Sequence, residues 1–121
     1  MRQLQSFSNS PIKTSKIIGS NVVNARGDSL GNIREIVMDP YTGRAAYSVV
    51  ALGGFLGMGE KLFAIPLSAF AYNVTKNEYV LNVSKERLEA APGFDAEHWP
   101  AMDDEKWNSD LHSYYELLPY W

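Results

Sequence analysis

The stretch NIREIVMDPYTGRAAYSVVAL, residues 32–52, has the pattern of two β-strands joined by a tight turn. Both ends of the stretch are rich in β-branched and apolar residues, which is typical of strands. The turn DPYTGR has suitable residues at the positions that matter: Asp39 can accept a backbone hydrogen bond, Pro40 fixes φ, and Gly43 can adopt the left-handed conformation that ends a bulged hairpin. We therefore predict a β-hairpin whose second strand, apolar on both faces, is central in a sheet.

Short β-rich runs alternate with turn residues through the rest of residues 16–91, which is the pattern of a small barrel or sandwich. The turn RGDSLG at 26–31 contains two glycines that can take positive φ. Pro66 ends one strand because it cannot donate to a ladder. A short helix is predicted over 84–91, with Ser84 as its N-cap. The predicted strands are residues 21–25, 32–39, 45–52, 61–65, 70–74 and 78–83.

The stretch ALGGFLGMGEKLFAIPL, residues 51–67, holds four glycines within seven residues. A phosphate-binding loop needs backbone N–H groups gathered at the start of a helix. Here a β-like run follows the glycines, and Gly-Lys-Ser/Thr and the dinucleotide fingerprint are both missing. We therefore interpret 53–60 as a strand connection that binds no nucleotide. Its large apolar residues either fold over an open end of the barrel or form a contact patch for a partner. These residues are Phe55, Leu56 and Met58.

Turn glycines and strand ends follow one another in a characteristic order along the chain. The series is Gly31, Asp39, Gly43, the glycine-rich stretch, Ile65, Pro66 and then SKERLEAAPGFD at 84–95. In this order, over residues 16–95, the chain resembles the PRC-barrel family and is most similar to its stand-alone members. The resemblance implies a mainly all-β fold: a small, highly bent antiparallel β-barrel of about six strands, with a short helix after the last strand. It implies no catalytic residues, because the family looks like an adaptor fold.

Residues 92–121 differ from the rest of the chain in charge and in aromatic content. Their net charge is −6, whereas residues 1–91 carry +3. They also hold seven of the fifteen aromatic residues, and disordered tails are poor in such residues. We predict that this C-terminal extension packs on its own barrel or on a partner subunit, with a helix within residues 103–118. The acidic residues form either a solvated face or a surface for a basic partner. The interface candidates in the extension are Trp99, Trp107, Tyr114, Tyr115 and Trp121.

Several classes of site are disfavoured by the residues that the chain has. There is no cysteine, so disulfides and thiolate metal sites are excluded. His98 and His112 are too few and too far apart in the sequence for a compact metal motif. No set of nucleophile and base can be argued. We therefore predict no metal, no cofactor and no enzymatic activity. The weakly basic barrel and the acidic extension also disfavour nucleic acid as a partner.

Residues 1–15 are expected to be a loose polar leader, because they lack the apolar core of a signal peptide. No apolar run approaches the roughly 20 residues of a membrane span. We therefore expect a cytoplasmic protein with no membrane span. Its domains would be the leader, the barrel at 16–91 and the extension at 92–121.

The predicted function is that of a non-enzymatic protein–protein interaction or adaptor module. We expect it to self-associate, as a homo-oligomer and most simply a dimer, and to bind a protein partner that the sequence does not identify. The alternative is a small-molecule or ion sensor, with a ligand at the barrel mouth near 53–60. A ligand pocket would show convergent polar groups, whereas an interface would show an exposed apolar patch.

Overall fold

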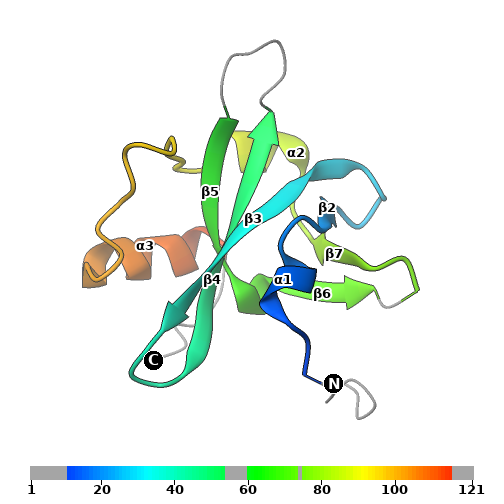
Figure 1. Cartoon of the computed structure of the whole chain (residues 1–121). Coiled ribbons are helices and arrows are strands. Elements are labelled where there is room, and N and C mark those ends of the chain that lie inside the picture. The colour runs from blue at the N-terminus through cyan, green and yellow to red at the C-terminus, as the bar shows by residue number, and fades with distance from the viewer. Residues whose placement is uncertain (1–10, 54–59, 74, 116–121) are drawn as a thin grey trace.

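The computed structural model describes residues 11–53, 60–73 and 75–115 (Figure 1). Within these ranges, six strands form one sheet in the order β5-β4-β3-β2-β7-β6, and three helices and one 3-10 turn lie around it. The elements are α1 (Thr14–Ile17), β2 (Asn21–Val23), β3 (Ser29–Asp39), β4 (Arg44–Gly53), β5 (Glu60–Pro66), η3 (Leu67–Ala69), β6 (Phe70–Asn73), β7 (Glu78–Leu81), α2 (Lys85–Glu89) and α3 (Glu105–Tyr114).

The sheet is curled into a half-barrel, so the mainly β, six-stranded fold class is confirmed. The prediction of an antiparallel sheet is wrong for one pair, since β2 runs parallel to β7. Parallel neighbouring strands need a crossover connection, and here the chain forms β3, β4, β5 and β6 between β2 and β7. The 3.6-residue repeat of a helix and the alternation of a strand are visible in a sequence, but the strand with which each strand pairs is not.

The β3–β4 hairpin has the turn that its sequence predicts. The Asp39 carboxylate accepts hydrogen bonds from the backbone N–H groups of Tyr41 (2.9 Å) and Thr42 (3.4 Å). The N–H of Gly43 donates to the carbonyl of Asp39 at 2.8 Å, and Gly43 has φ = 75°. This conformation is unfavourable for residues with a Cβ atom, so a glycine is well suited to close the turn.

Glycine at position 31 allows β3 and β4 to come close together. Gly31 has φ = 151°, and a Cβ atom placed on it would lie 2.2 Å from the carbonyl oxygen of Ala51 in β4. The register between the two strands shifts twice, at Ile33/Glu35 and at Val37/Met38. Such irregularities increase local twist and bend, which is consistent with the curl of this sheet.

Strand β4 is covered on both faces, as its sequence predicts. Neighbouring residues of a strand point to opposite faces, yet Val49 and Val50 are both fully buried. Val50 packs in the main core, which the curled sheet encloses together with Leu88 of α2. Val49 belongs to a second cluster with Ala51 and Leu62, and Phe94 of the C-terminal extension packs against that cluster.

The helices lie close to where the sequence predicts them. Helix α2 is capped by Ser84, whose hydroxyl accepts a hydrogen bond from the N–H of Arg87 at 3.0 Å. The first strand ends earlier than predicted, because the side chain of Asn24 accepts hydrogen bonds from two N–H groups of the following turn. Helix α1 was not predicted, and it lies partly within the segment expected to be a loose leader. Its Ile17 packs against the core.

The C-terminal extension packs on the barrel of its own chain. Phe94 extends the sheet at β5, with hydrogen bonds to Leu62 in both directions at 2.8 and 2.9 Å. Asp104 caps α3 by accepting from the N–H groups of two first-turn residues. Helix α3 then packs against β5 and buries Leu111 and His112. Burial of these side chains stabilises the extension on the sheet.

Candidate interaction groove

Only some of the predicted interface candidates can be placed. Four of them lie outside the described residues: Phe55, Leu56, Met58 and Trp121. The predictions about the glycine-rich connection and the barrel mouth near 53–60 concern the same undescribed part of the chain. The structure places the other four, which are Trp99, Trp107, Tyr114 and Tyr115.

Trp107 faces its own barrel. Its ring lies 5.5 Å from the ring of Tyr47 in β4, with an angle of 70° between the two planes. This edge-to-face arrangement is favourable for aromatic pairs. His112, one turn further along α3, meets the same tyrosine at 6.0 Å. Trp107 is half-buried, so it joins the extension to the sheet and leaves little of its ring for a partner.

Tyr114 and Tyr115 also make contacts within the chain. The hydroxyl of Tyr114 donates to the backbone carbonyl of Arg87 at 2.6 Å, and the Arg87 guanidinium lies over the Tyr114 ring at 4.4 Å. The same guanidinium donates a hydrogen bond to the carbonyl of Tyr114. Tyr115 is buried, and this burial raises the pKa of its hydroxyl above the ordinary value. These contacts join α3 to α2.

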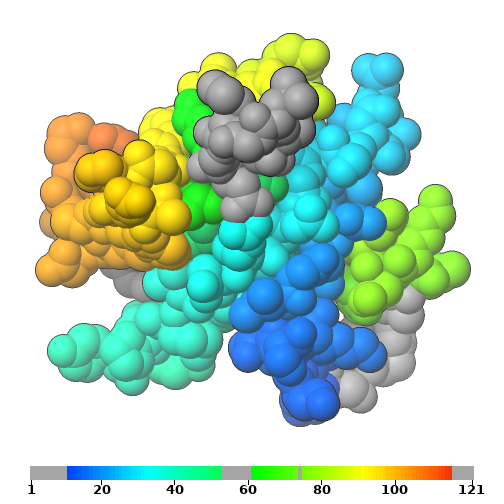
Figure 2. Space-filling model, turned by 45° about the horizontal axis from the view of Figure 1, so that its top comes forward, coloured from blue at the N-terminus to red at the C-terminus, as the bar shows by residue number. Residues whose placement is uncertain are grey.

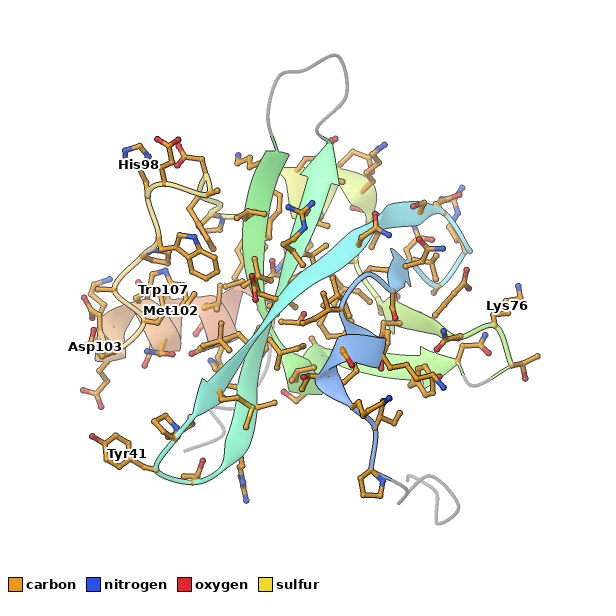
Figure 3. All side chains as sticks on the ribbon, in the orientation of Figure 1. Tyr41, Lys76, His98, Met102, Asp103 and Trp107 are labelled. Carbon is orange, nitrogen blue, oxygen red and sulfur yellow. The ribbon has the colours of Figure 1, made fainter. Side chains whose placement is uncertain are left out.

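Trp99 is the most exposed of the four, with 42% of its surface accessible. It stacks at an angle on Phe94, with ring centroids 4.9 Å apart. The neighbouring His98 lies 2.7 Å from the carboxylate of Asp95 and points outward in Figure 3. The hydrogen bond from His98 holds the pKa of Asp95 below its ordinary value.

A groove of about 410 Å³ lies between the tip of the β3–β4 hairpin and the start of α3. We call it the hairpin–tail groove. In Figure 3 Tyr41 extends from the hairpin turn on one side, and Met102 and Asp103 of the extension lie on the other. The residues that line it are Val37, Met38, Asp39, Pro40, Tyr41, Ala46, Tyr47, Met102, Asp103, Glu105 and Asn108.

The hairpin–tail groove combines an apolar lining with a negative rim. Met38 is 48% exposed and Tyr41 is 97% exposed, so both are accessible to another molecule. Methionine is flexible and adapts to the shape of a partner, and tyrosine is enriched at interface hot spots. Among the described lining residues there are three carboxylates, Asp39, Asp103 and Glu105, and no basic side chain.

The sequence analysis did not identify the hairpin side of this groove. Met38 and Tyr41 appeared only as parts of a strand and a turn. One available signal was a large aromatic residue in a turn, where small polar residues are more usual. The tail side was predicted only as an acidic aromatic segment. The two sides are some sixty residues apart in the sequence, and only the fold brings them together.

Two negative findings apply to the residues that the structure describes. Residues 11–53, 60–73 and 75–115 contain no group of three His, Cys, Asp or Glu side chains placed to hold a metal ion. Within the same ranges, no helix is long and apolar enough to cross a membrane.

The chain was compared with known protein families, curated proteins and solved structures. The sequence profile of the PRC-barrel domain matches residues 12–88, which is more than half of the chain. No curated protein matches the chain in sequence. Solved structures that resemble it include a protein of Pseudomonas aeruginosa described as a 16S ribosomal RNA processing protein, RimM, with 14% sequence identity and a TM-score of 0.43. That alignment covers 65% of this chain and 48% of the Pseudomonas chain, so the two share less than half of the latter's length. With the family's profile spanning α1 to α2 and the curled six-stranded sheet present, the chain belongs to the PRC-barrel family.

Proposed function

We propose that the chain is a non-enzymatic protein–protein interaction module that self-associates as a dimer. The observation that carries this proposal is the hairpin–tail groove, an open apolar surface bounded by the almost fully exposed ring of Tyr41. Exposed apolar surface of this kind favours contact with another protein over contact with water. The proposal assigns no catalytic step to any residue of the chain.

The candidate residues of the extension support the proposal in a different way from the one expected. Trp107 and Tyr115 pack within the chain, so they hold the extension against the barrel and leave the contact with a partner to the residues that line the groove. Side chains that are already packed within the chain need no further ordering when a partner binds, which lowers the entropy cost of association.

The test is the mass of the protein in solution over a wide range of concentration, measured by analytical ultracentrifugation. We expect the average mass to rise from that of one chain to that of two. Tyr41→Ser should weaken the association, whereas Tyr72→Ser, which alters another exposed tyrosine on β6, should leave it unchanged. A wild-type chain that stays monomeric at every concentration would refute self-association.

A further inference from the structure

The N-terminal helix presents a second exposed surface, and this one is basic. Ile17 of α1 packs against the core, which leaves the other side of this short helix toward solvent. Ile12 and Ile18 are 42% and 39% exposed, and Lys13 and Lys16 are exposed beside them. We call these four residues the basic N-terminal surface. The first 27 residues of the sequence contain no aspartate or glutamate, so no nearby residue in the sequence offsets this charge.

The basic N-terminal surface and the hairpin–tail groove are complementary. Each surface has two exposed apolar side chains, and the charged residues of the two surfaces have opposite signs. Of the six large apolar side chains left exposed in the described residues, four belong to these two surfaces: Ile12, Ile18, Met38 and Tyr41. Apolar contact supplies affinity, and the surrounding charges favour the correct orientation of the two partners.

The charge of the groove is not cancelled by the extension itself. Lys106 is the only lysine or arginine between positions 92 and 121, and its ammonium group lies 2.8 Å from the carboxylate of Asp110. This pair lies one turn apart along α3. The carboxylates of Asp103 and Glu105 therefore remain as the main charges on the tail side of the groove.

We propose that the basic N-terminal surface of one copy docks in the hairpin–tail groove of a second copy. This inference rests on the proposed self-association and specifies how it occurs. Figure 2 shows α1, in blue, and the β3–β4 hairpin, in teal, as neighbours on one face of the molecule. Because these two segments lie on one face, a two-fold axis lets each α1 meet the hairpin side of the other copy's groove, which gives two identical contacts and a closed dimer.

The first experiment reverses the charge of each surface separately. Lys13→Glu with Lys16→Glu should weaken the dimer about tenfold or more, because attraction becomes repulsion at both contacts. Asp103→Lys with Glu105→Lys should do the same. The matched control is Lys76→Glu with Lys85→Glu, which reverses two exposed lysines outside both surfaces. Lys76 lies on the opposite side of the molecule from Tyr41 in Figure 3, and the control should leave the dimer unchanged.

The second experiment mixes the two charge-reversed variants, labelled with different fluorophores. Each variant alone has two repulsive contacts, whereas a mixed dimer pairs an acidic α1 with a basic groove and a basic α1 with an acidic groove. We expect the mixture to dimerise at concentrations at which each variant alone is monomeric. Asp103→Lys alone serves as a second groove variant in case reversal at Glu105 weakens α3, and circular dichroism reports the fold of every variant.

The outcomes separate this inference from the proposed function. If the wild type dimerises and both reversed variants dimerise equally well, self-association stands and the α1–groove contact is refuted. If each variant is monomeric and the mixture is also monomeric, the contact is refuted as well. If the wild type is monomeric, both proposals fail, and the groove is then a candidate for a different protein that carries a basic, apolar segment.

Discussion

Leu111→Ala should destabilise the whole protein, because the C-terminal extension and the barrel share a core. Leu111 of α3 is buried and belongs to the main core cluster. The substitution removes three carbon atoms, which corresponds to about 2.4 kcal/mol of lost transfer free energy. The cavity that remains adds to this cost, and leucine-to-alanine changes in cores cost about 2–5 kcal/mol. We expect a loss of about 3 kcal/mol in the free energy of unfolding.

Urea unfolding with two probes measures this effect. All three tryptophans lie at or after position 99, so tryptophan fluorescence reports on the extension, while far-UV circular dichroism reports mainly on the sheet. For a chain of this size the midpoint should fall by about 1–2 M urea, and both probes should move together. Ser113→Ala, at an exposed position of the same helix, should change stability by less than about 0.5 kcal/mol.

A different result would refute the shared core. If Leu111→Ala shifts the fluorescence transition and leaves the circular dichroism transition at its wild-type midpoint, the extension unfolds independently of the barrel. If neither midpoint moves, the side chain does not contribute packing energy at all.

Three further changes test local features. Asp104→Ala removes the cap of α3 and should cost about 1 kcal/mol in urea unfolding, whereas Asp104→Asn should retain most of that stability; equal losses would exclude the capping role. Gly31→Ala should lower the free energy of unfolding by about 2 kcal/mol or more, because the new Cβ atom would overlap a β4 carbonyl. Gly19 also has positive φ but has open space around it, so the control Gly19→Ala should cost about 1 kcal/mol. The hydrogen bond from His98 lowers the pKa of Asp95. The contribution of this hydrogen bond to stability is therefore present above the unfolded-state pKa of Asp95 and is lost as the pH falls through its folded-state pKa. An NMR titration should give Asp95 a lower midpoint in the wild type than in His98→Ala, and identical midpoints would contradict the pairing.

Local features of the fold could be predicted from the sequence because local chemistry determines them. Asp39, Pro40 and Gly43 specify one turn, whatever the rest of the chain does. Ser84 specifies a helix start in the same way. The strong apolar character of β4 indicated coverage on both faces, and the structure shows that the extension provides the second cover.

The pairing of distant segments could not be predicted by the same reasoning. Nothing local to β2 or β7 indicates that they run parallel, since β2 is only three residues long and β7 has the ordinary alternation of a half-buried strand. The hairpin–tail groove has the same difficulty, because Tyr41 and Asp103 become neighbours only after α3 has packed on β5. The aromatic residues of the extension suggested that it packs on another surface. The presence of Trp107 and Tyr115 in the sequence does not indicate whether that surface belongs to the same chain or to a second one.

The acidic and aromatic residues of the extension therefore have separate roles. The aromatic side chains that face the sheet, such as Trp107, stabilise the extension on the barrel through buried apolar surface. Exposed ion pairs contribute little to stability, so the charge of Asp103 and Glu105 does not explain why the extension packs. We expect this charge to act on the molecules that approach the groove, because exposed carboxylates around an apolar surface favour a basic partner. Added salt should thus weaken the proposed dimer while leaving the Leu111 contribution to folding almost unchanged. A dimer whose dissociation constant does not change with salt would show that charge does not guide the contact.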